Sequence, residues 1–384
     1  MSTGSVGRAV RTLLRAAQPS STFPVASTSK LILSSSPTFA PSRRAQTLVG
    51  CTCHIQHRNY STPPTPPKQG PLAPRKKRTI LDLQSLKRKK IPITVLTAHD
   101  YPSARFIEAA SAPISPPSAP DDAATPALPR GIDICLVGDS LAMVACGYTS
   151  TTQLTLPELL FHCRSVARGC TTSFLIADMP FGTFISSTRD GVIAATQIIQ
   201  EGHMDAVKIE GGHEVVDLVH RLTSVGIPVM GHVGLTPQRQ TTLSGFRVQG
   251  RTAQGAFAVW QDALAIQEAG AFAIVLEAVP RKLGKFISES LDIPVIGIGA
   301  GGDCDGQVLV QLDMLGVRSL GKGPKFLKTY ANLEETATAA VEEYAREVRT
   351  GVFPEEKHGY AMEEVEWKSF MEAVEQLEPV EEVE

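Results

Sequence analysis

The sequence predicts a (β/α)₈ barrel, and three observations support this fold class. Short apolar runs rich in Val, Ile and Leu, typical of strands covered on both faces, alternate with segments of helical periodicity. The alternation continues over roughly 250 residues, the usual length of such a barrel. Five of the runs end in an ionisable side chain: Asp139, Asp178, Glu210, His232 and Glu277. Because parallel barrel strands all end at one mouth, we expect these groups to converge there.

Residues 1–60 precede the predicted barrel and have the composition of a mitochondrial transit peptide. The chain has no Asp or Glu before Asp82, whereas arginines recur through 8–15 along a potentially amphipathic helix. Residues 58–61 (RNYS) resemble a matrix-processing site with cleavage before Ser61. We therefore expect import into the mitochondrial matrix. The alternative is a basic tail without a targeting role.

The rest of the chain divides into a linker, the barrel and a tail. Residues 61–78 are Pro-rich and predict a linker, whose basic end at 75–78 could also be read as a nuclear signal. Residues 79–361 predict the catalytic barrel. Residues 362–384 carry nine Glu and one Lys and predict an acidic tail with a short amphipathic helix.

Eight apolar runs predict the barrel strands, and 191–202 and 253–269 predict two of the helices between them. Residues 111–129 are rich in Pro, Ala and Ser and predict a surface insertion between the first helix and the second strand. The predicted strands are 93–98, 133–138, 173–178, 205–210, 227–231, 272–277, 294–298 and 310–315.

Charge, hydropathy and cysteine content exclude several classes of protein. The formal charge is −2, and residues 1–60 carry seven basic and no acidic side chains, so the processed chain has a charge of −9. Such an acidic body argues against nucleic-acid binding. No apolar run reaches the ~18 residues of a membrane span. The seven cysteines form no C-x-x-C pair, so we expect neither a disulfide framework nor structural zinc.

Three of the strand-end carboxylates are candidate metal ligands. Asp139, Asp178 and Glu210 supply only oxygen, which suits a hard cation such as Mg²⁺. Magnesium binds few protein carboxylates, so two direct ligands and one through water would satisfy it. For any one of these acids, the alternative is a helix N-cap just after its strand.

The other candidates are two basic side chains, Lys208 and His232, and one possible proton acceptor, Glu277. Lys208 and Glu210 are two residues apart on one strand and face the same way, so Lys208 could bind a substrate carboxylate or form an internal ion pair. Glu277 closes an apolar strand, where desolvation would make it a better base near neutral pH. His232 could bind substrate or metal, or make a structural hydrogen bond.

A glycine-rich segment, GIGAGG at 297–302, follows the seventh predicted strand. In a barrel, such glycines often let a ligand approach the backbone, which makes Gly299 and Gly301 candidate cofactor-binding positions. The segment does not match the dinucleotide fingerprint, because no suitable acidic residue and strand–helix unit follow it.

Several ordered motifs resemble the 3-methyl-2-oxobutanoate hydroxymethyltransferase family, also called ketopantoate hydroxymethyltransferases. The resemblance runs from about Thr79 to Met362. The motifs are VGDSLAMVACGY (137–148), IADMPFGTF (176–184), VKIEGG (207–212), VMGHVGLTPQ (229–238), GFRVQGR (245–251), VLEAVP (275–280), IPVIGIGAG (293–301), PKFLKTYANL (324–333) and GVFPEEKH (351–358).

The resemblance implies a fold and a reaction. It implies a barrel of the phosphoenolpyruvate mutase and isocitrate lyase type, assembled into a homo-oligomer, commonly a decamer. It also implies transfer of a one-carbon unit from 5,10-methylenetetrahydrofolate to 3-methyl-2-oxobutanoate, giving 2-dehydropantoate for pantothenate biosynthesis.

The resemblance also implies residue roles by motif matching. Asp139 and Asp178 would ligate Mg²⁺, and Glu210 would complete the site directly or through water. The keto acid would contact Ser140 and Lys208 together with Asp139, Asp178 and His232. Glu277 would accept the proton.

Two other functions are compatible with a barrel of this type. One is a Mg-dependent C–C lyase or mutase, but those enzymes usually carry a K-[KR]-C-G-H type motif that this sequence lacks. The other is a catalytically inactive oligomeric folate-binding scaffold. The full set of acidic and basic candidates argues against it.

Overall fold

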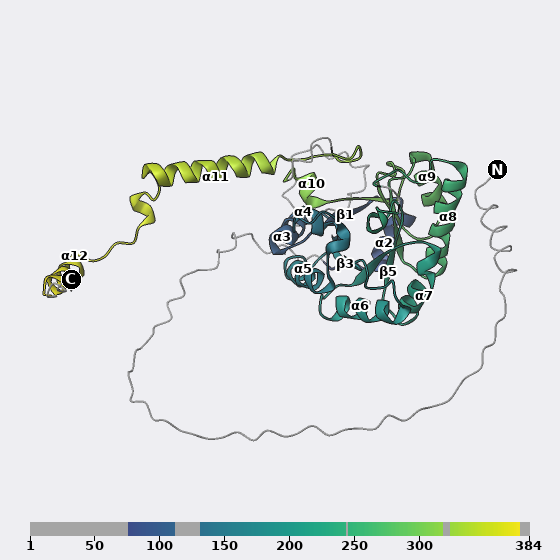
Figure 1. The fold of residues 1–384 in the computed structure, drawn as a ribbon, viewed down its shortest axis with the longest axis horizontal. Coiled ribbons are helices and arrows are strands. Elements are labelled where there is room, and N and C mark those ends of the chain that lie inside the picture. The colour runs from purple at the N-terminus through teal and green to yellow at the C-terminus, as the bar shows by residue number, and fades with distance from the viewer. Residues whose placement is uncertain (1–75, 112–130, 243–244, 318–322, 377–384) are drawn as a thin grey trace, which may run out of the picture. The chain divides into compact units, whose positions relative to one another are not determined.

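A computed structural model describes residues 76–111, 131–242, 245–317 and 323–376 (Figure 1). The predicted transit peptide, most of the linker and nearly all of the 111–129 insertion lie outside these residues. The described part contains a closed barrel of eight parallel strands in the order β1 to β8, with β8 pairing back to β1. The strands are β1 (Ile93–Thr97), β2 (Ile134–Val137), β3 (Phe174–Asp178), β4 (Ala206–Glu210), β5 (Val229–Gly234), β6 (Ala273–Glu277), β7 (Val295–Ile298) and β8 (Gly306–Leu309).

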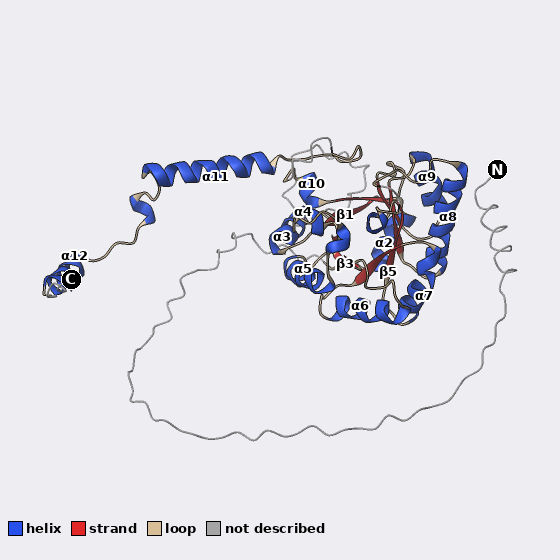
Figure 2. Cartoon of the chain, in the orientation of Figure 1, coloured by secondary structure: helices blue, strands red, loops and turns tan. Residues whose placement is uncertain are grey.

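Helices follow most strands and surround the barrel, as Figure 2 shows. Short 3₁₀ turns lie at η1 (Thr151–Gln153), η2 (His213–Val215), η3 (Pro237–Arg239) and η4 (Glu356–His358). The α-helices are α2 (Ile80–Arg88), α3 (Tyr101–Ala110), α4 (Leu141–Val144), α5 (Leu156–Gly169), α6 (Thr188–Gln200), α7 (Val216–Ser224), α8 (Ala253–Glu268), α9 (Arg281–Ser290), α10 (Gln311–Met314), α11 (Leu333–Thr350) and α12 (Glu364–Glu375).

The predicted barrel fold is confirmed, and seven of its predicted strands are present. The helices predicted at 191–202 and 253–269 correspond to α6 and α8, and the helix predicted in the acidic tail corresponds to α12.

The prediction of the eighth strand at 310–315 is wrong. The strand is Gly306–Leu309, and Gln311–Met314 forms α10 instead. An apolar run this short does not distinguish a strand from a helical turn by its periodicity. Gly306 packs against β1 so closely that a Cβ there would lie 2.4 Å from the carbonyl oxygen of Ile93. Between the end of β7 at Ile298 and the start of β8 at Gly306 there is no crossover helix, so a short link joins the two strands.

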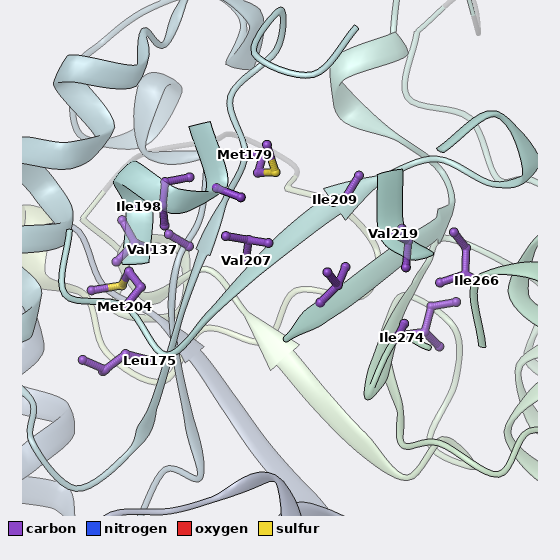
Figure 3. Packing of buried hydrophobic residues seen from close by; sticks show 14 of the residues in the cluster. Val137, Leu175, Met179, Ile198, Met204, Val207, Ile209, Val219, Ile266 and Ile274 are labelled. Atoms are coloured by element: carbon purple, nitrogen blue, oxygen red, sulfur yellow. The ribbon is translucent and has the colours of Figure 1, made fainter. Parts of the chain in front are cut away.

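Two buried apolar clusters hold the barrel together. The larger lies between the strands and the surrounding helices and includes Val207 and Ile209 of β4 and Ile198 of α6 (Figure 3). The smaller fills the barrel interior and includes Leu83 and Leu86 of α2. Because α2 closes the amino end of the barrel, the carboxyl end is the open one.

Local sequence signals explain the individual helices. Helix α5 begins with a capping box, in which Thr155 and Glu158 satisfy each other's backbone N–H groups. Its buried positions Leu159, Cys163 and Val166 recur at helical spacing and face the larger cluster. No helix within the described residues combines the length and the apolar character that a membrane span requires. The five cysteines from Cys135 onward are free thiols.

Candidate active site

A cavity of about 360 Å³ opens at the carboxyl ends of the barrel strands. Every acidic and basic residue singled out in the sequence lines it, as does Ser140, which precedes α4. We use the term charged floor for the six ionisable residues among them: Asp139, Asp178, Lys208, Glu210, His232 and Glu277. The expected convergence at one mouth is therefore present.

The strand pattern explains why these side chains point into the cavity. Lys208 and Glu210 alternate along β4 with Val207 and Ile209, which are buried among the outer helices. The acids do not cap the helices that follow their strands. The N-cap positions after β2, β3 and β4 belong to Ser140, Ser187 and Gly212.

Asp178 links β2 and β4 across the cavity. Its Oδ2 accepts a hydrogen bond of 2.9 Å from the backbone N–H of Asp139. Its Oδ1 lies 3.0 Å from Nζ of Lys208, its partner in the strand register. Thus the buried ion pair of Lys208 is with Asp178 on the neighbouring strand, and not with Glu210 on its own strand.

His232 lies between two carboxylates of the floor. Its Nε2 is 3.1 Å from Oε2 of Glu277, and its Nδ1 is 3.2 Å from Oε1 of Glu210. The Nδ1 atom is also 3.3 Å from Nζ of Lys208. The histidine is 2 % exposed, so it serves as an internal bridge between the two acids. Glu277 is more open to the cavity than its neighbours on the floor.

Gln238 belongs to this site, although the sequence offered no chemical reason to select it. Its backbone N–H donates to Oε2 of Glu210 at 3.0 Å, and its side-chain Nε2 donates to Oδ2 of Asp139 at 2.8 Å. The same Nε2 donates to the carbonyl oxygen of Met179 at 3.0 Å. Gln238 therefore orients two acids that come from different strands. The only earlier signal was its place at the end of the VMGHVGLTPQ motif.

The electrostatics of the floor are dominated by crowded negative charge. Burial and the neighbouring carboxylates of Asp178 and Glu210 raise the pKa of Asp139 well above its usual range. Burial also acts to lower the pKa of Lys208, but the surrounding carboxylates outweigh it and the net shift is upward. For His232, burial and Lys208 are likewise outweighed by the two glutamates, which raises its pKa to about 9.

The donor set fits a hard divalent cation. Five carboxyl groups line the cavity (the four on the floor and Asp313) against two basic groups, Lys208 and His232. Neither Oδ1 of Asp178 nor Oε1 of Glu210 receives a hydrogen bond, although each has a basic nitrogen at ion-pair distance. A bound cation would relieve this excess of buried negative charge.

The described residues contain no group of three or more His, Cys, Asp or Glu side chains arranged to hold a metal ion by themselves. In proteins, Mg²⁺ uses one or two carboxylates and fills its other positions with water or substrate oxygens.

The two candidate glycines do not line the cavity. Gly299 has φ +66°, and a Cβ there would lie 2.8 Å from a ring carbon of Phe326. Gly301 has φ +91° and lies against the side chain of Arg281. Both lie against other side chains, and Phe326, the neighbour of Gly299, lines the cavity.

A second cavity of about 660 Å³ lies on the outer side of β1 and β8, beside α3 and α10. Its lining includes no carboxylate, lysine or histidine. It therefore lacks the groups needed for acid–base or metal chemistry, and we assign the active site to the barrel mouth.

The closed parallel barrel and its acidic mouth define this chain as a (β/α)₈-barrel enzyme. A family model described as ketopantoate hydroxymethyltransferase matches residues 121–356. The chain belongs to this family and is an enzyme of the hydroxymethyltransferase type.

Relatives of the chain include proteins named 3-methyl-2-oxobutanoate hydroxymethyltransferase. One from Emericella nidulans is 43% identical over 337 residues, covering 88% of this chain and 90% of the relative. Another, from Moorella thermoacetica, is 45% identical over 289 residues, covering 75% of this chain and all of the relative (100%).

Solved structures with a similar barrel include a phosphonopyruvate hydrolase in complex with oxalate and Mg²⁺. It is 15% identical with a TM-score of 0.46, covering 78% of this chain and 98% of the hydrolase chain. The assignment of the site therefore rests on the strand order and the cavity of this chain, and not on that structural similarity.

Proposed function

We propose that this enzyme transfers a hydroxymethyl group to 3-methyl-2-oxobutanoate, giving 2-dehydropantoate for pantothenate biosynthesis. The one-carbon donor is 5,10-methylenetetrahydrofolate. One water molecule is consumed because the transferred methylene becomes a hydroxymethyl group, and tetrahydrofolate is released. The observation that carries the proposal is the convergence of Asp139, Asp178, Lys208, Glu210 and Glu277 on one cavity, in a chain of this family.

The keto acid would be held by the metal ligands and the basic side of the floor. Asp139 and Asp178 would bind Mg²⁺, with Glu210 as a direct or water-mediated ligand. When bound, the cation acts as a Lewis acid toward the keto oxygen. Lys208 supplies a buried positive charge for the substrate carboxylate, and Ser140, which lines the same cavity, supplies a hydroxyl donor. Gln238 keeps the carboxylates of Asp139 and Glu210 in place.

Glu277 is the proton acceptor in this proposal. The proton at C3, next to the ketone, moves to the carboxylate of Glu277, and the electron pair of the broken C–H bond passes into the enolate. The enolate carbon then forms its new bond to the one-carbon unit. Both C–N bonds of the folate-borne methylene break, and the hydroxyl group of one water molecule takes the remaining position on that carbon. The two folate nitrogens take up the proton of that water and the proton held by Glu277, so tetrahydrofolate leaves. His232, 3.1 Å from Glu277, fixes the orientation of that carboxylate. The base thus has a rigid partner on one side and the open cavity on the other.

Product formation by the full chain tests this proposal. We expect 2-dehydropantoate from 3-methyl-2-oxobutanoate, methylenetetrahydrofolate and Mg²⁺, detected by mass spectrometry. EDTA should abolish the reaction, and excess Mg²⁺ should restore it. In D₂O without folate, the C3 proton signal of the keto acid should disappear by NMR as deuterium enters. If the purified, folded chain shows neither product formation nor C3 proton exchange, the proposal is wrong.

The N-terminal region supports a proposal about location and assembly. We infer that residues 1–60 direct the enzyme to the mitochondrial matrix, on their basic, acid-free composition and the alignment with a eukaryotic relative. The mature protein recovered from mitochondria should begin at Ser61 by N-terminal sequencing; an intact Met1 would contradict this. We also infer a homo-oligomer, a decamer by resemblance, which light scattering would measure.

A further inference from the structure

The active-site cavity has a second half that the charged floor does not explain. Large apolar side chains line the same cavity as the floor. We use the term apolar wall for five of them: Pro237, Phe246, Pro324, Phe326 and Leu327. They come from the segment after β5 and the segment after α10, which lie far apart in the sequence. A small branched keto acid bound by the floor does not explain why two aromatic rings line the same cavity.

Both aromatic rings of the wall remain exposed to solvent. Phe246 is 57 % exposed and Phe326 is 37 % exposed. Exposed aromatic side chains that share one cavity with charged groups are typical of ligand sites, which combine apolar walls with a few polar anchors. The two rings therefore have apolar surface available to a ligand.

The backbone holds Phe326 in a defined place. Its ring lies on Gly299 at the end of β7, where a Cβ would lie 2.8 Å from the ring carbon Cδ1. Any other residue at Gly299 would push the ring away, and the φ of +66° further favours glycine. Gly299 therefore contributes to the cavity indirectly, by setting the position of Phe326.

The backbone also ties Phe246 to the strand that carries the base. The N–H of Gln249 donates to the carbonyl oxygen of Ala278 at 2.9 Å, directly after Glu277. The N–H of Gly245 donates to the carbonyl oxygen of Gln240 at 2.8 Å. These bonds fix the backbone on both sides of Phe246, whose side chain lines the same cavity as Glu277.

We propose that the apolar wall binds the pterin ring system of methylenetetrahydrofolate, with Phe246 and Phe326 as its aromatic contacts. This inference rests on the proposed function. The reactive methylene carbon is bonded to N5 of the pterin and to the adjoining N10, so the pterin must lie close to the carbon that Glu277 deprotonates. The flat pyrimidine part of the reduced pterin gains from stacking on aromatic side chains. The charged floor binds the keto acid, and the wall binds the one-carbon donor.

Alanine variants at the two phenylalanines distinguish folate binding by the apolar wall from keto acid binding by the charged floor. For Phe246→Ala and Phe326→Ala, we expect the KM for methylenetetrahydrofolate to rise at least tenfold, about 1.4 kcal/mol. The KM for the keto acid should stay within twofold of the parent value. The folate-independent exchange of the C3 proton in D₂O should also stay within twofold.

Three further variants control for the shape of the side chain and for general effects of substitution. Phe326→Leu keeps an apolar side chain but loses the flat ring, so it should share the folate defect even if the alanine variant folds poorly. Phe326→Tyr keeps the ring and should restore most of the affinity. Phe257→Ala removes a similarly exposed phenylalanine, 54 % exposed, from the outer helix α8 and should change neither KM.

The outcomes distinguish this inference from the proposed function. If the parent enzyme exchanges the C3 proton and the variants keep an unchanged KM for folate, the wall does not bind the ring and the inference is wrong. If the variants lose exchange and folate affinity together, the phenylalanines belong to the keto acid site, which also overturns it. If the parent enzyme itself shows no exchange or product, the proposed function fails first.

Discussion

Replacing Glu277 with glutamine should lower turnover and C3 proton exchange by about 10²–10⁴-fold, the usual contribution of a general base. Glutamine has nearly the same shape as glutamate, but its amide cannot accept the proton. The carboxylate lies 3.1 Å from Nε2 of His232 and is the most open to the cavity of the four acids on the floor. Turnover is measured as 2-dehydropantoate formed, and exchange is measured by NMR in D₂O.

The binding properties of the Glu277→Gln variant show whether the loss is chemical. Its affinities for Mg²⁺ and for the keto acid should remain within about threefold of the parent, because Glu277 is not among the proposed metal ligands. Glu268→Gln, which alters an exposed glutamate on α8, is the matched control and should keep full activity. Exchange at the parent rate in Glu277→Gln would assign the base to another residue.

Replacing Asp178 with asparagine should weaken Mg²⁺ binding by at least about 100-fold. Loss of a group that merely supports a ligand costs 10–100-fold in metal affinity, so loss of a ligand should cost at least as much. The change also removes the buried partner of Lys208, 3.0 Å away, but it relieves repulsion among the crowded carboxylates. These two effects on stability oppose each other, and we expect the barrel to remain folded without metal.

Thermal unfolding with and without Mg²⁺ provides the measurement, alongside calorimetric titration. A cation that binds only the folded protein raises its Tm, so the parent should gain stability with Mg²⁺ and Asp178→Asn should not. Asp133→Asn is the matched control, since Asp133 is equally buried but lies before β2, where it pairs with Arg78 at 3.0 Å. That variant should lose stability and keep its Mg²⁺ response. Unchanged Mg²⁺ affinity in Asp178→Asn would reject the ligand assignment.

The positions of the charged floor could be predicted because they follow from strand periodicity. An apolar run that ends in an acid places that acid at a strand terminus, and parallel barrel strands all terminate on one side. Asp178, Glu210 and Glu277 satisfied this rule, each standing at the last position of its strand. Residues of this kind are visible because their charge interrupts an apolar pattern.

The periodicity of apolar residues predicts neither the role of Gln238 nor the position of the eighth strand. Gln238 acts through one backbone and one side-chain hydrogen bond to acids on other strands, a role that no local pattern encodes. The run after Gly306 is too short to separate strand from helix, and only closure of the sheet against β1 assigns it. The pairing partner of Lys208 was likewise open, because strand register decides which neighbouring carboxylate is near.

The sequence by itself determined the barrel, the mouth that carries the chemistry and the acids and bases within it. These could be predicted because apolar runs that end in a charged residue are visible in the sequence itself. Only the tertiary structure decided the contacts between those groups, the place of Gln238 and the presence of Phe246 and Phe326 in the same cavity as the floor. Such contacts join segments far apart in the sequence. They depend on strand register and on how loops pack over the strand ends, and neither leaves a periodic signal.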